Sequence, residues 1–269
     1  MAGTEHARGK APEDAGLPQE AVTDALEWMR ITYALDYAAK ADSWDRPEDY
    51  PQLWTARAYV SDQILELDGG TVHADAQGEI AVAEASVYVI PNVGDVNFFD
   101  TMDAHSAELC QFAEAFIAAG SDHEDLSIDG EPVIDGDLLI LSWLAVQPPF
   151  RGHRVGQQVL KAILRAVGRS TGVVALRAAP GLRDGMEEGS LEHRRESRAL
   201  AKYWGELGFR RLNGDFMVLA DEAIFDLLED QQQDDSEVAV EALQDVPLMQ
   251  MSEQERDAVF KSLRRELDD

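Results

Sequence analysis

The chain has only one cysteine, Cys110, among its 269 residues. This excludes an internal disulfide and a cysteine-based zinc site, and the six histidines are too scattered to indicate a metal site of another kind. Chains without disulfides are typical of a reducing compartment. We therefore expect a cytoplasmic protein with no bound metal.

Long hydrophobic runs are missing as well. The longest apolar run lies within residues 138–146, which is far too short to span a bilayer. Residues 1–16 are polar and lack the apolar core of a signal peptide. The sequence predicts a soluble protein with no membrane partner.

Positive charge is scarce, and most of it is concentrated in one segment. The net charge of −29 divides into −23 for residues 1–150, +7 for residues 151–211 and −13 for residues 212–269. A basic segment in an acidic chain favours a ligand that carries phosphate groups, although arginines on helix surfaces also serve solubility alone. The basic residues are not interleaved with aromatic ones, so we expect no nucleic-acid partner.

The length and the patterning predict one main domain over residues 18–222. Residues 1–17 are rich in Ala, Gly, Glu and Pro and are expected to be a disordered tail. An acidic, glutamine-rich linker is expected over 223–251, followed by a terminal helix over 252–269 that begins with a capping box. Packing or partner contact is the default role of such a helix, and a homodimer stays an open alternative.

Within the domain, the order of the expected elements predicts an α/β (α+β) fold with a mixed sheet. Alternating or continuous apolar residues predict strands, and apolar residues at helical spacing predict helices. The predicted strands cover 78–92 (as one or two strands), 136–146, 172–180 and a hairpin over 209–220. The predicted helices cover 19–41 (one helix or a broken pair), 103–119, 155–167 and 192–207, while 58–67 suits either type.

The stretch "LAVQPPFRGHRVGQQVLKAIL", residues 144–164, joins the end of a buried strand to a helix that begins near Val155. Backbone N–H groups and the positive end of the helix dipole meet at such a junction, which suits a pyrophosphate. Gly152 and Gly156 let the chain approach phosphate oxygens, and Arg151 and Arg154 add charge. The stretch is not a Walker loop, because no Gly-Lys-Ser/Thr follows, and it lacks the three glycines of the dinucleotide fingerprint.

This stretch resembles motif A of the GNAT superfamily of N-acetyltransferases. Val146, Pro148, Arg151, Gly152 and Gly156 match the motif in register. A second stretch, "SRALAKYWGELGFRRL", is similar to the helix and Leu-Gly-Phe strand start that follow in the family, with residues 207–209 aligned. The resemblance covers about 136–220. It implies a GNAT-like mixed, mostly antiparallel central sheet flanked by helices and splayed at the cofactor-binding strand.

The resemblance also implies acetyl-CoA as the acyl donor and an amine as the acceptor. The backbone of the strand end would pair with the pantetheine arm, and the loop amides would hold the pyrophosphate. Arg154 stands where the family usually has glycine, so its guanidinium should turn outward, toward a ribose phosphate or simply to solvent. Ser197 stands where relatives often have asparagine. The implied cofactor-binding residues are Leu144, Ala145 and Val146 in the strand, Arg151, Gly152, His153, Arg154, Val155 and Gly156 in the loop, and Ser197 and Trp204 in the later helix.

Two residues are candidates for acid and base. In many relatives the acid is a tyrosine five residues before the phenylalanine of Leu-Gly-Phe, a position that Trp204 holds here. We take its neighbour Tyr203 as the acid, although the two point about 100° apart on a helix and a core tyrosine or protonation by solvent are alternatives. Glu84 interrupts an apolar strand, where a carboxylate tends to be desolvated and its pKa raised, so we take it as the base. An outward-facing or edge position is the alternative.

The acceptor is less defined by the sequence. Asp100, Asp103 and His105 form a second polar group that could line its site, although helix N-capping explains Asp103 or Ser106 equally well. The acidic first half of the chain favours a cationic amine by electrostatic steering. The alternative function is a catalytically weak CoA-binding sensor or protein-interaction module, which Trp204 in place of tyrosine favours.

Overall fold

The computed structural model of the chain describes residues 19–36, 51–62, 74–181, 187–220 and 223–228. The chain divides into one unit over 1–224 and a second over 225–269. The fold and the site described below belong to the first unit. The predicted tail over 1–17 and terminal helix over 252–269 lie outside the described residues, and residues 223–228, where the linker was expected to begin, are helical.

A seven-stranded sheet forms the centre of the first unit, in the order β1-β2-β3-β6-β7-β9-β8. Neighbouring strands are antiparallel except β6 and β7, which are parallel, so the predicted mixed, mostly antiparallel sheet is confirmed. A separate pair, β4 and β5, is antiparallel. The strands are β1 (Arg30–Asp36), β2 (Gln52–Ser61), β3 (Glu79–Ile90), β4 (Ser127–Ile128), β5 (Glu131–Pro132), β6 (Asp137–Val146), β7 (Thr171–Arg177), β8 (Arg210–Asn213) and β9 (Phe216–Ala220).

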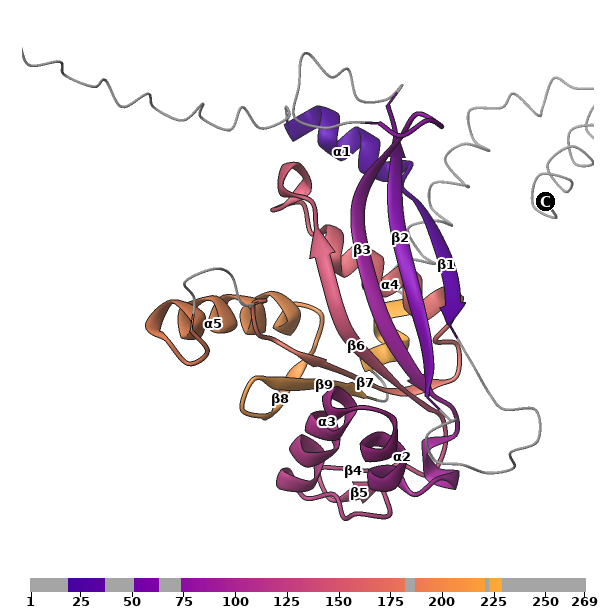
Figure 1. Ribbon diagram of the computed structural model, residues 1–269, viewed down its shortest axis with the longest axis vertical. Helices are drawn as coiled ribbons and strands as arrows, with labels where there is room; N and C mark the ends of the chain where they lie inside the picture. The colour runs from indigo at the N-terminus through magenta and orange to yellow at the C-terminus, as the bar shows by residue number, and fades with distance from the viewer. Residues whose placement is uncertain (1–18, 37–50, 63–73, 182–186, 221–222, 229–269) are drawn as a thin grey trace, which may run out of the picture. The chain divides into compact units, whose positions relative to one another are not determined.

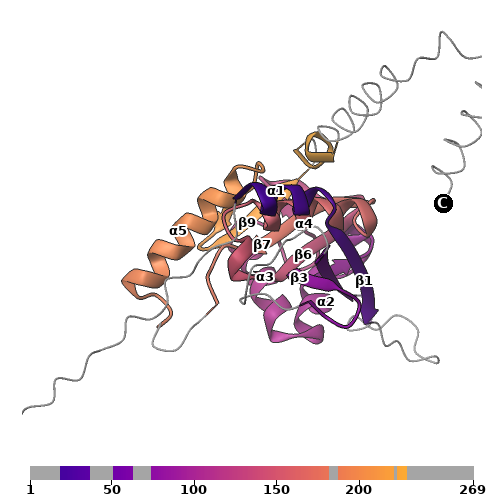
Figure 2. The ribbon, with the colours of Figure 1, turned by 90° about the horizontal axis from the view of Figure 1, so that it is seen from above.

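Helices lie on both faces of this sheet. They are α1 (Gln19–Glu27), α2 (Phe98–His105), α3 (Ala107–Ala118), α4 (Val155–Ala166) and α5 (Leu191–Gly205), with short 3-10 turns at η2 (Val93–Asp95) and η3 (Pro148–Phe150). Figure 1 shows α4 behind the sheet and α2 and α3 in front of its lower end. The view from above agrees, and both views place α5 beyond β7 and β9, to one side of the sheet (Figure 2).

Apolar residues at helical spacing hold α4 and α3 to opposite faces. The α4 stripe that includes Val159, Leu160 and Ile163 is buried, and α4 contacts β2, β3 and β6. On the other face, Phe112 and Phe116 of α3 belong to a core cluster built on the lower ends of β3 and β6. Burying each such side chain stabilises the fold by roughly 1.5–3 kcal/mol.

The upper part of the α3 face carries no helix among the described residues and is called the open face below (Figure 1). Strand register shows which side chains share it, because paired residues point to the same side of a sheet. Thr32, Arg57 and Glu84 form one row across β1, β2 and β3, and Ser86 pairs with Trp143 in the next row.

Several predicted elements are confirmed. The structure has the buried strand β6, the helix α4 from Val155, the helix α5, the strand β7 and the hairpin of β8 and β9. The region 78–92 forms one strand, β3, and the ambiguous region 58–67 is strand as far as Ser61, within the described residues.

Two helix predictions are wrong in part. The helix over 19–41 ends at Glu27, and β1 follows, because the segment pairs with β2 along its whole length. The helix over 103–119 is two helices. Ser106 has extended backbone (φ −160°) between them and accepts a hydrogen bond from the N–H of Leu109 at 3.2 Å, so it ends α2 and caps α3.

Candidate functional site

The site is built where β6 runs on beyond its parallel neighbour. The pairing of β6 with β7 ends at Leu141 and Leu176, whereas its pairing with β3 continues to Val146 and Ala83. Residues 142–146 therefore have β3 on one side and no strand of the described residues on the other. Figure 1 shows this end of β6 rising alone on the side toward α5. The splay expected at this strand is present.

The free side of β6 exposes particular backbone groups. The N–H of Gln147 donates to the carbonyl of Val82 on β3 at 2.8 Å. Since successive residues of a strand direct their backbone groups to opposite sides, Ala145 faces β3, while Leu144 and Val146 face the free side. Two of the three predicted strand residues, Leu144 and Val146, thus present backbone groups on this free side of β6. The free side of residues 144–146 is called the open edge below. The Val146 carbonyl already accepts a hydrogen bond from Nε of Arg151 at 3.0 Å.

The loop after β6 turns sharply at two left-handed positions. Gly152 has φ 86° and Arg154 has φ 58°. A side chain at Gly152 would meet nothing within 4 Å, so glycine is needed there for its backbone conformation. Arg154 adopts a conformation that costs a non-glycine residue roughly 1–2 kcal/mol.

Four backbone amides remain available at this turn. Within the described residues, no hydrogen bond uses the N–H of Gly152, His153, Arg154 or Val155. No side chain caps the start of α4, whose first amides carry the positive end of the helix dipole. The Arg154 guanidinium lies 3.4 Å from the Glu206 carboxylate, so it turns toward α5. The loop thus offers four amides, while the charge of Arg154 is shared with Glu206; its role toward a ligand stays a prediction.

Tyr203 reaches this turn from α5. Its phenol oxygen accepts a hydrogen bond from the N–H of Gln157 at 2.9 Å. A Cβ atom on Gly156 would lie 2.9 Å from this oxygen and 3.2 Å from Cδ2 of Leu144. The phenol therefore lies beside both the start of α4 and the open edge. Gly156 is needed here because Tyr203 and Leu144 pack against it. The phosphate approach expected at Gly156 stays a prediction.

The protonation of Tyr203 follows from this position. Burial raises the pKa of the phenol above its ordinary value of 10.0, and the amides of Gln157 and Gly156 oppose this by stabilising the phenolate. Within the described residues, the phenol hydrogen has no acceptor. Tyr203 thus holds a proton at neutral pH and has it free to donate.

Trp204 and Ser197 occupy the buried side of α5. The Trp204 ring packs edge-on against Tyr203 at 4.9 Å and against Phe209 at 6.0 Å between ring centroids. Trp204 is thus a core residue that supports Tyr203. Ser197 is 3% exposed, and its hydroxyl has no hydrogen-bond partner within the described residues. A buried hydroxyl without a partner is uncommon, and a polar group of a ligand would satisfy it.

Sequence reasoning missed Gln157. This residue is buried and donates from Nε2 to the Tyr203 carbonyl at 2.7 Å, so it ties α4 to α5. The sequence carried a signal, because Gln157 interrupts the apolar stripe of α4 three residues before Leu160. A polar residue on such a stripe is usually hydrogen-bonded.

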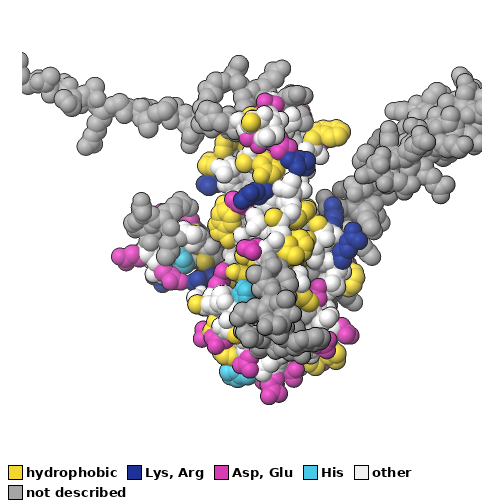
Figure 3. Space-filling view, turned by 45° about the vertical axis from the view of Figure 1, so that its right-hand side comes forward, with side chains coloured by type: hydrophobic (Ala, Val, Ile, Leu, Met, Phe, Trp, Pro, Cys, Tyr) yellow, Lys and Arg dark blue, Asp and Glu magenta, His cyan; other side chains and the backbone are white. Residues whose placement is uncertain are grey.

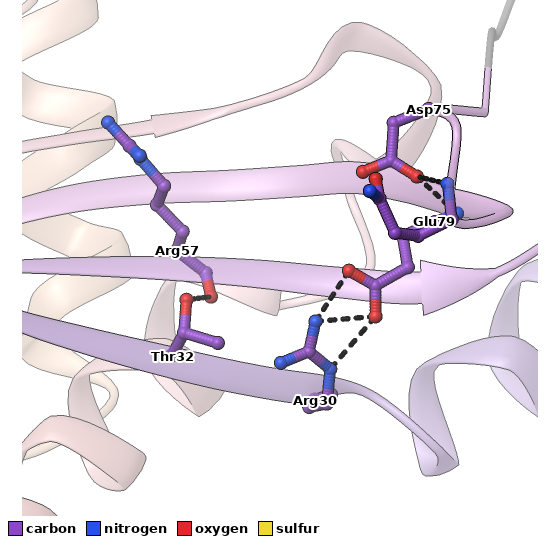
Figure 4. A network of polar contacts seen from close by, with 6 residues as sticks. Arg30, Thr32, Arg57, Asp75 and Glu79 are labelled. Atoms are coloured by element: carbon purple, nitrogen blue, oxygen red, sulfur yellow. Dashed lines mark hydrogen bonds and ion pairs between the residues drawn. The ribbon is translucent and has the colours of Figure 1, made fainter.

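Glu84 has a more polar setting than expected. Its carboxylate accepts a hydrogen bond from Nε of Arg57 at 2.8 Å, and its side chain is 40% exposed. The desolvation predicted from the apolar strand is therefore wrong, and Glu84 lies on the open face. Figure 4 shows Arg57 there beside a second cross-strand ion pair, Arg30 with Glu79. Hydrogen bonding to Glu84 raises the pKa of Arg57, so the guanidinium stays charged.

The polar group around Asp103 has structural roles. Asn97 caps α2 by accepting from the N–H of Asp100 at 2.9 Å, and Ser106 caps α3, so the capping role suggested for Asp103 is wrong. Asp103 instead accepts a hydrogen bond from the thiol of Cys110, which raises the pKa of that thiol to about 11. His105 lies edge-on to Tyr88 at 5.4 Å between ring centroids.

Among the described residues, no group of three or more His, Cys, Asp or Glu side chains could hold a metal ion. In the same part of the chain, none of the helices has the length and apolar character needed to cross a membrane. Comparison with known proteins adds no name to the site: no protein-family model matches the chain, and no curated protein is significantly similar to it in sequence.

Proposed function

We propose that the protein is an acetyl-CoA-dependent N-acetyltransferase that moves the acetyl group to a primary amine. The observation that carries this proposal is the junction of three features. The open edge of β6 at Leu144 and Val146, the four available amides before α4, and the Tyr203 phenol lie next to one another.

The residues present suit the donor chemically. Amides at a helix start and the guanidinium of Arg151 complement the negative charge of a pyrophosphate, whereas Arg154 adds its charge only when it leaves Glu206. An open strand edge offers N–H and C=O groups to an extended chain that contains amides, as pantetheine does. The buried hydroxyl of Ser197 is a further polar group without a partner within the described residues.

The reaction requires that the amine and the thioester are oriented toward each other and that two protons are transferred. Acetyl-CoA supplies the thioester whose carbonyl the amine attacks directly. On the protein side, Glu84 on the open face accepts a proton from the ammonium, directly or through water. Tyr203 keeps its proton at the phenol oxygen beside Leu144 and donates it to the departing sulfur.

The alternative is a protein that binds CoA with little turnover. Two observations favour it: Arg57 pairs with the carboxylate of Glu84, and Trp204, at the position of the family's tyrosine, is buried in the core. A panel of amines assayed for CoA release separates the two functions. Release above the rate of thioester hydrolysis supports the transferase, and binding without such release supports the alternative.

Donor binding is tested by melting temperature. At about 100 times its dissociation constant, acetyl-CoA should add roughly 2.7 kcal/mol of stability, a shift of roughly 5–10 °C for a domain of this size. Arg151→Glu should weaken binding at least about tenfold. Arg169→Glu makes the same charge change beyond the other end of α4 and should leave affinity unchanged. An unshifted wild-type melting temperature would overturn the proposal.

A further inference from the structure

Next to the open edge, an irregularity in β6 places two side chains on the open face. The register with β3 shifts so that Ser86 pairs with Trp143 while Val87 pairs with Leu141, which leaves Ser142 as an extra residue. Such bulges re-aim side chains and recur beside active sites. Here the bulge directs Trp143 to the open face, immediately before Leu144.

Ser142 fixes a carboxylate at this point. Its hydroxyl donates to Oε1 of Glu108 at 2.6 Å. Glu108 is exposed in the first turn of α3, and none of the ion pairs within the described residues involves it. Glu84 on the same face shares its charge with Arg57. Glu108 is thus held in place by a neutral hydroxyl and keeps an unbalanced negative charge.

Two aromatic residues belong to the same region: Trp143 directly follows Ser142, which holds the carboxylate, and Tyr88 is close enough for the charge of Glu108 to act on it. Trp143 is 47% exposed, which is unusual for so large an apolar side chain, and it makes no ring contact within the described residues. Tyr88 is half-buried against His105, and the nearby charge of Glu108 adds to burial in raising the pKa of Tyr88. Figure 3 shows acidic side chains gathered around the lower part of the molecule, where α2 and α3 lie.

We propose that Tyr88, Glu108, Ser142 and Trp143, here called the Glu108 cluster, bind the non-reacting ammonium of an aliphatic diamine. The inference rests on the proposed function and names its acceptor class. A fixed carboxylate near an exposed indole ring is the chemistry that recognises an alkylammonium ion, through an ion pair and cation–π attraction together.

Strand geometry sets the length of the diamine. Each residue of a strand advances roughly 3.3 Å. The backbone of Leu144 to Val146 therefore lies roughly 3–10 Å along the strand from that of Trp143. A short aliphatic diamine spans such a distance. One ammonium rests on the Glu108 cluster while the other nitrogen loses a proton and reaches the acetyl group at the open edge.

The test compares two acceptors that differ by one amino group. Initial rates of CoA release are measured with diaminobutane and with butylamine over a range of concentrations. The wild type should show a kcat/KM at least about tenfold higher for diaminobutane, as expected for one charged contact. Glu108→Gln should raise the KM for diaminobutane about tenfold and leave the KM for butylamine unchanged.

Matched variants separate recognition from folding. Glu114→Gln removes a carboxylate from the exposed side of the same helix and should change neither KM. Trp143→Leu, which keeps an apolar side chain, should also lower the preference for diaminobutane. Equal use of both amines, or a Glu108→Gln variant with unchanged KM, overturns the cluster assignment while the transferase proposal stands.

If no amine releases CoA, the proposed function fails and the Glu108 cluster is decided by binding alone. Diaminobutane, added without acetyl-CoA, should then raise the melting temperature of the wild type and not that of Glu108→Gln. No shift in either protein overturns the inference.

Discussion

Tyr203 combines the features of a structural tie and of a proton donor in one side chain. Its oxygen accepts from the Gln157 amide, which holds α5 against the start of α4. Its hydrogen remains available beside Leu144, at the open edge. These roles use different parts of the hydroxyl, so substitution by phenylalanine removes both while the packing of the ring is kept.

We predict that Tyr203→Phe lowers kcat by roughly tenfold or more, the scale of a general acid. Because burial raises the pKa of Tyr203 above 10.0, the phenol stays protonated over the neutral and mildly alkaline range. In the wild-type pH–rate profile, the midpoint for loss of this acid should therefore lie above pH 10.0. Full activity of the variant, with its melting temperature unchanged, would remove Tyr203 from the catalytic assignment.

Glu84 is tested against a neighbour in a matched setting. Glu84→Gln should lower kcat roughly tenfold or more at neutral pH if the carboxylate accepts the ammonium proton. Glu79 on the same strand makes a similar ion pair, with Arg30 in place of Arg57. Glu79→Gln should leave kcat unchanged. Equal losses in the two variants would indicate that both ion pairs support the sheet and that neither carboxylate is the base.

Cys110 provides a test of the structure without any assay of function. A thiol whose pKa is raised to about 11 by Asp103 is almost wholly neutral at pH 8, so alkylation should be roughly 100-fold slower than that of a free cysteine. Asp103→Asn lowers the pKa and should speed the reaction, measured by mass spectrometry. Asp100→Asn, on the same helix, is the control. Equal rates in all three proteins would contradict the contact.

Among the elements, those with an unambiguous pattern were predictable from the sequence. The apolar stripe of α4, the buried apolar run of β6 and the glycines at the end of α5 predicted the three elements that surround the site. The helix predicted over the segment of β1 was wrong, because Ile31, Tyr33 and Leu35 also fit the alternation of a strand and pairing with β2 decided the outcome. The break between α2 and α3 depends on the backbone of one residue, Ser106, which helical periodicity does not reveal.

The contact between α4 and α5 predicts the effect of a single methyl group. In Gly156→Ala, the new Cβ would lie 2.9 Å from the Tyr203 oxygen, so the variant should lose about 1–3 kcal/mol of unfolding free energy. Adding Tyr203→Phe removes the closest atom and should recover at least about 0.5 kcal/mol.

Gly205→Ala is the control for Gly156→Ala, because a Cβ atom on Gly205 would meet nothing within 4 Å. Alanine at this helical position should be neutral or stabilise the protein by up to about 1 kcal/mol. Urea denaturation of the wild type, the two single variants and the double variant measures the cycle, with Gly205→Ala measured beside them. Additive effects of Gly156→Ala and Tyr203→Phe would contradict the packing of the phenol on Gly156.

At the scale of the whole molecule, the residues of the proposed donor half were easier to predict from the sequence than those of the proposed acceptor half. The donor residues are nearly contiguous, in a loop and the helix that follows. The proposed acceptor half instead assembles β2, β3 and β6 of the open face with α3 beside them, and the partners of Glu84 and Ser142 lie 27 and 34 residues away from them. Such pairs depend on sheet register and a bulge, neither of which a single sequence specifies.

The net charge of −29 predicts how salt affects the KM for a cationic acceptor and for an uncharged one. A cationic acceptor is attracted by the acidic molecule, and salt screens this attraction, since the Debye length falls from roughly 10 Å at 0.1 M to 3 Å at 1 M. Raising NaCl should therefore increase the KM for diaminobutane several-fold. An acceptor that is uncharged at the assay pH should keep its KM, because the field of the protein exerts no net force on it. A KM for diaminobutane that stays constant with salt would mean that short-range contacts alone, and not the acidic surface, bring the amine to the open face.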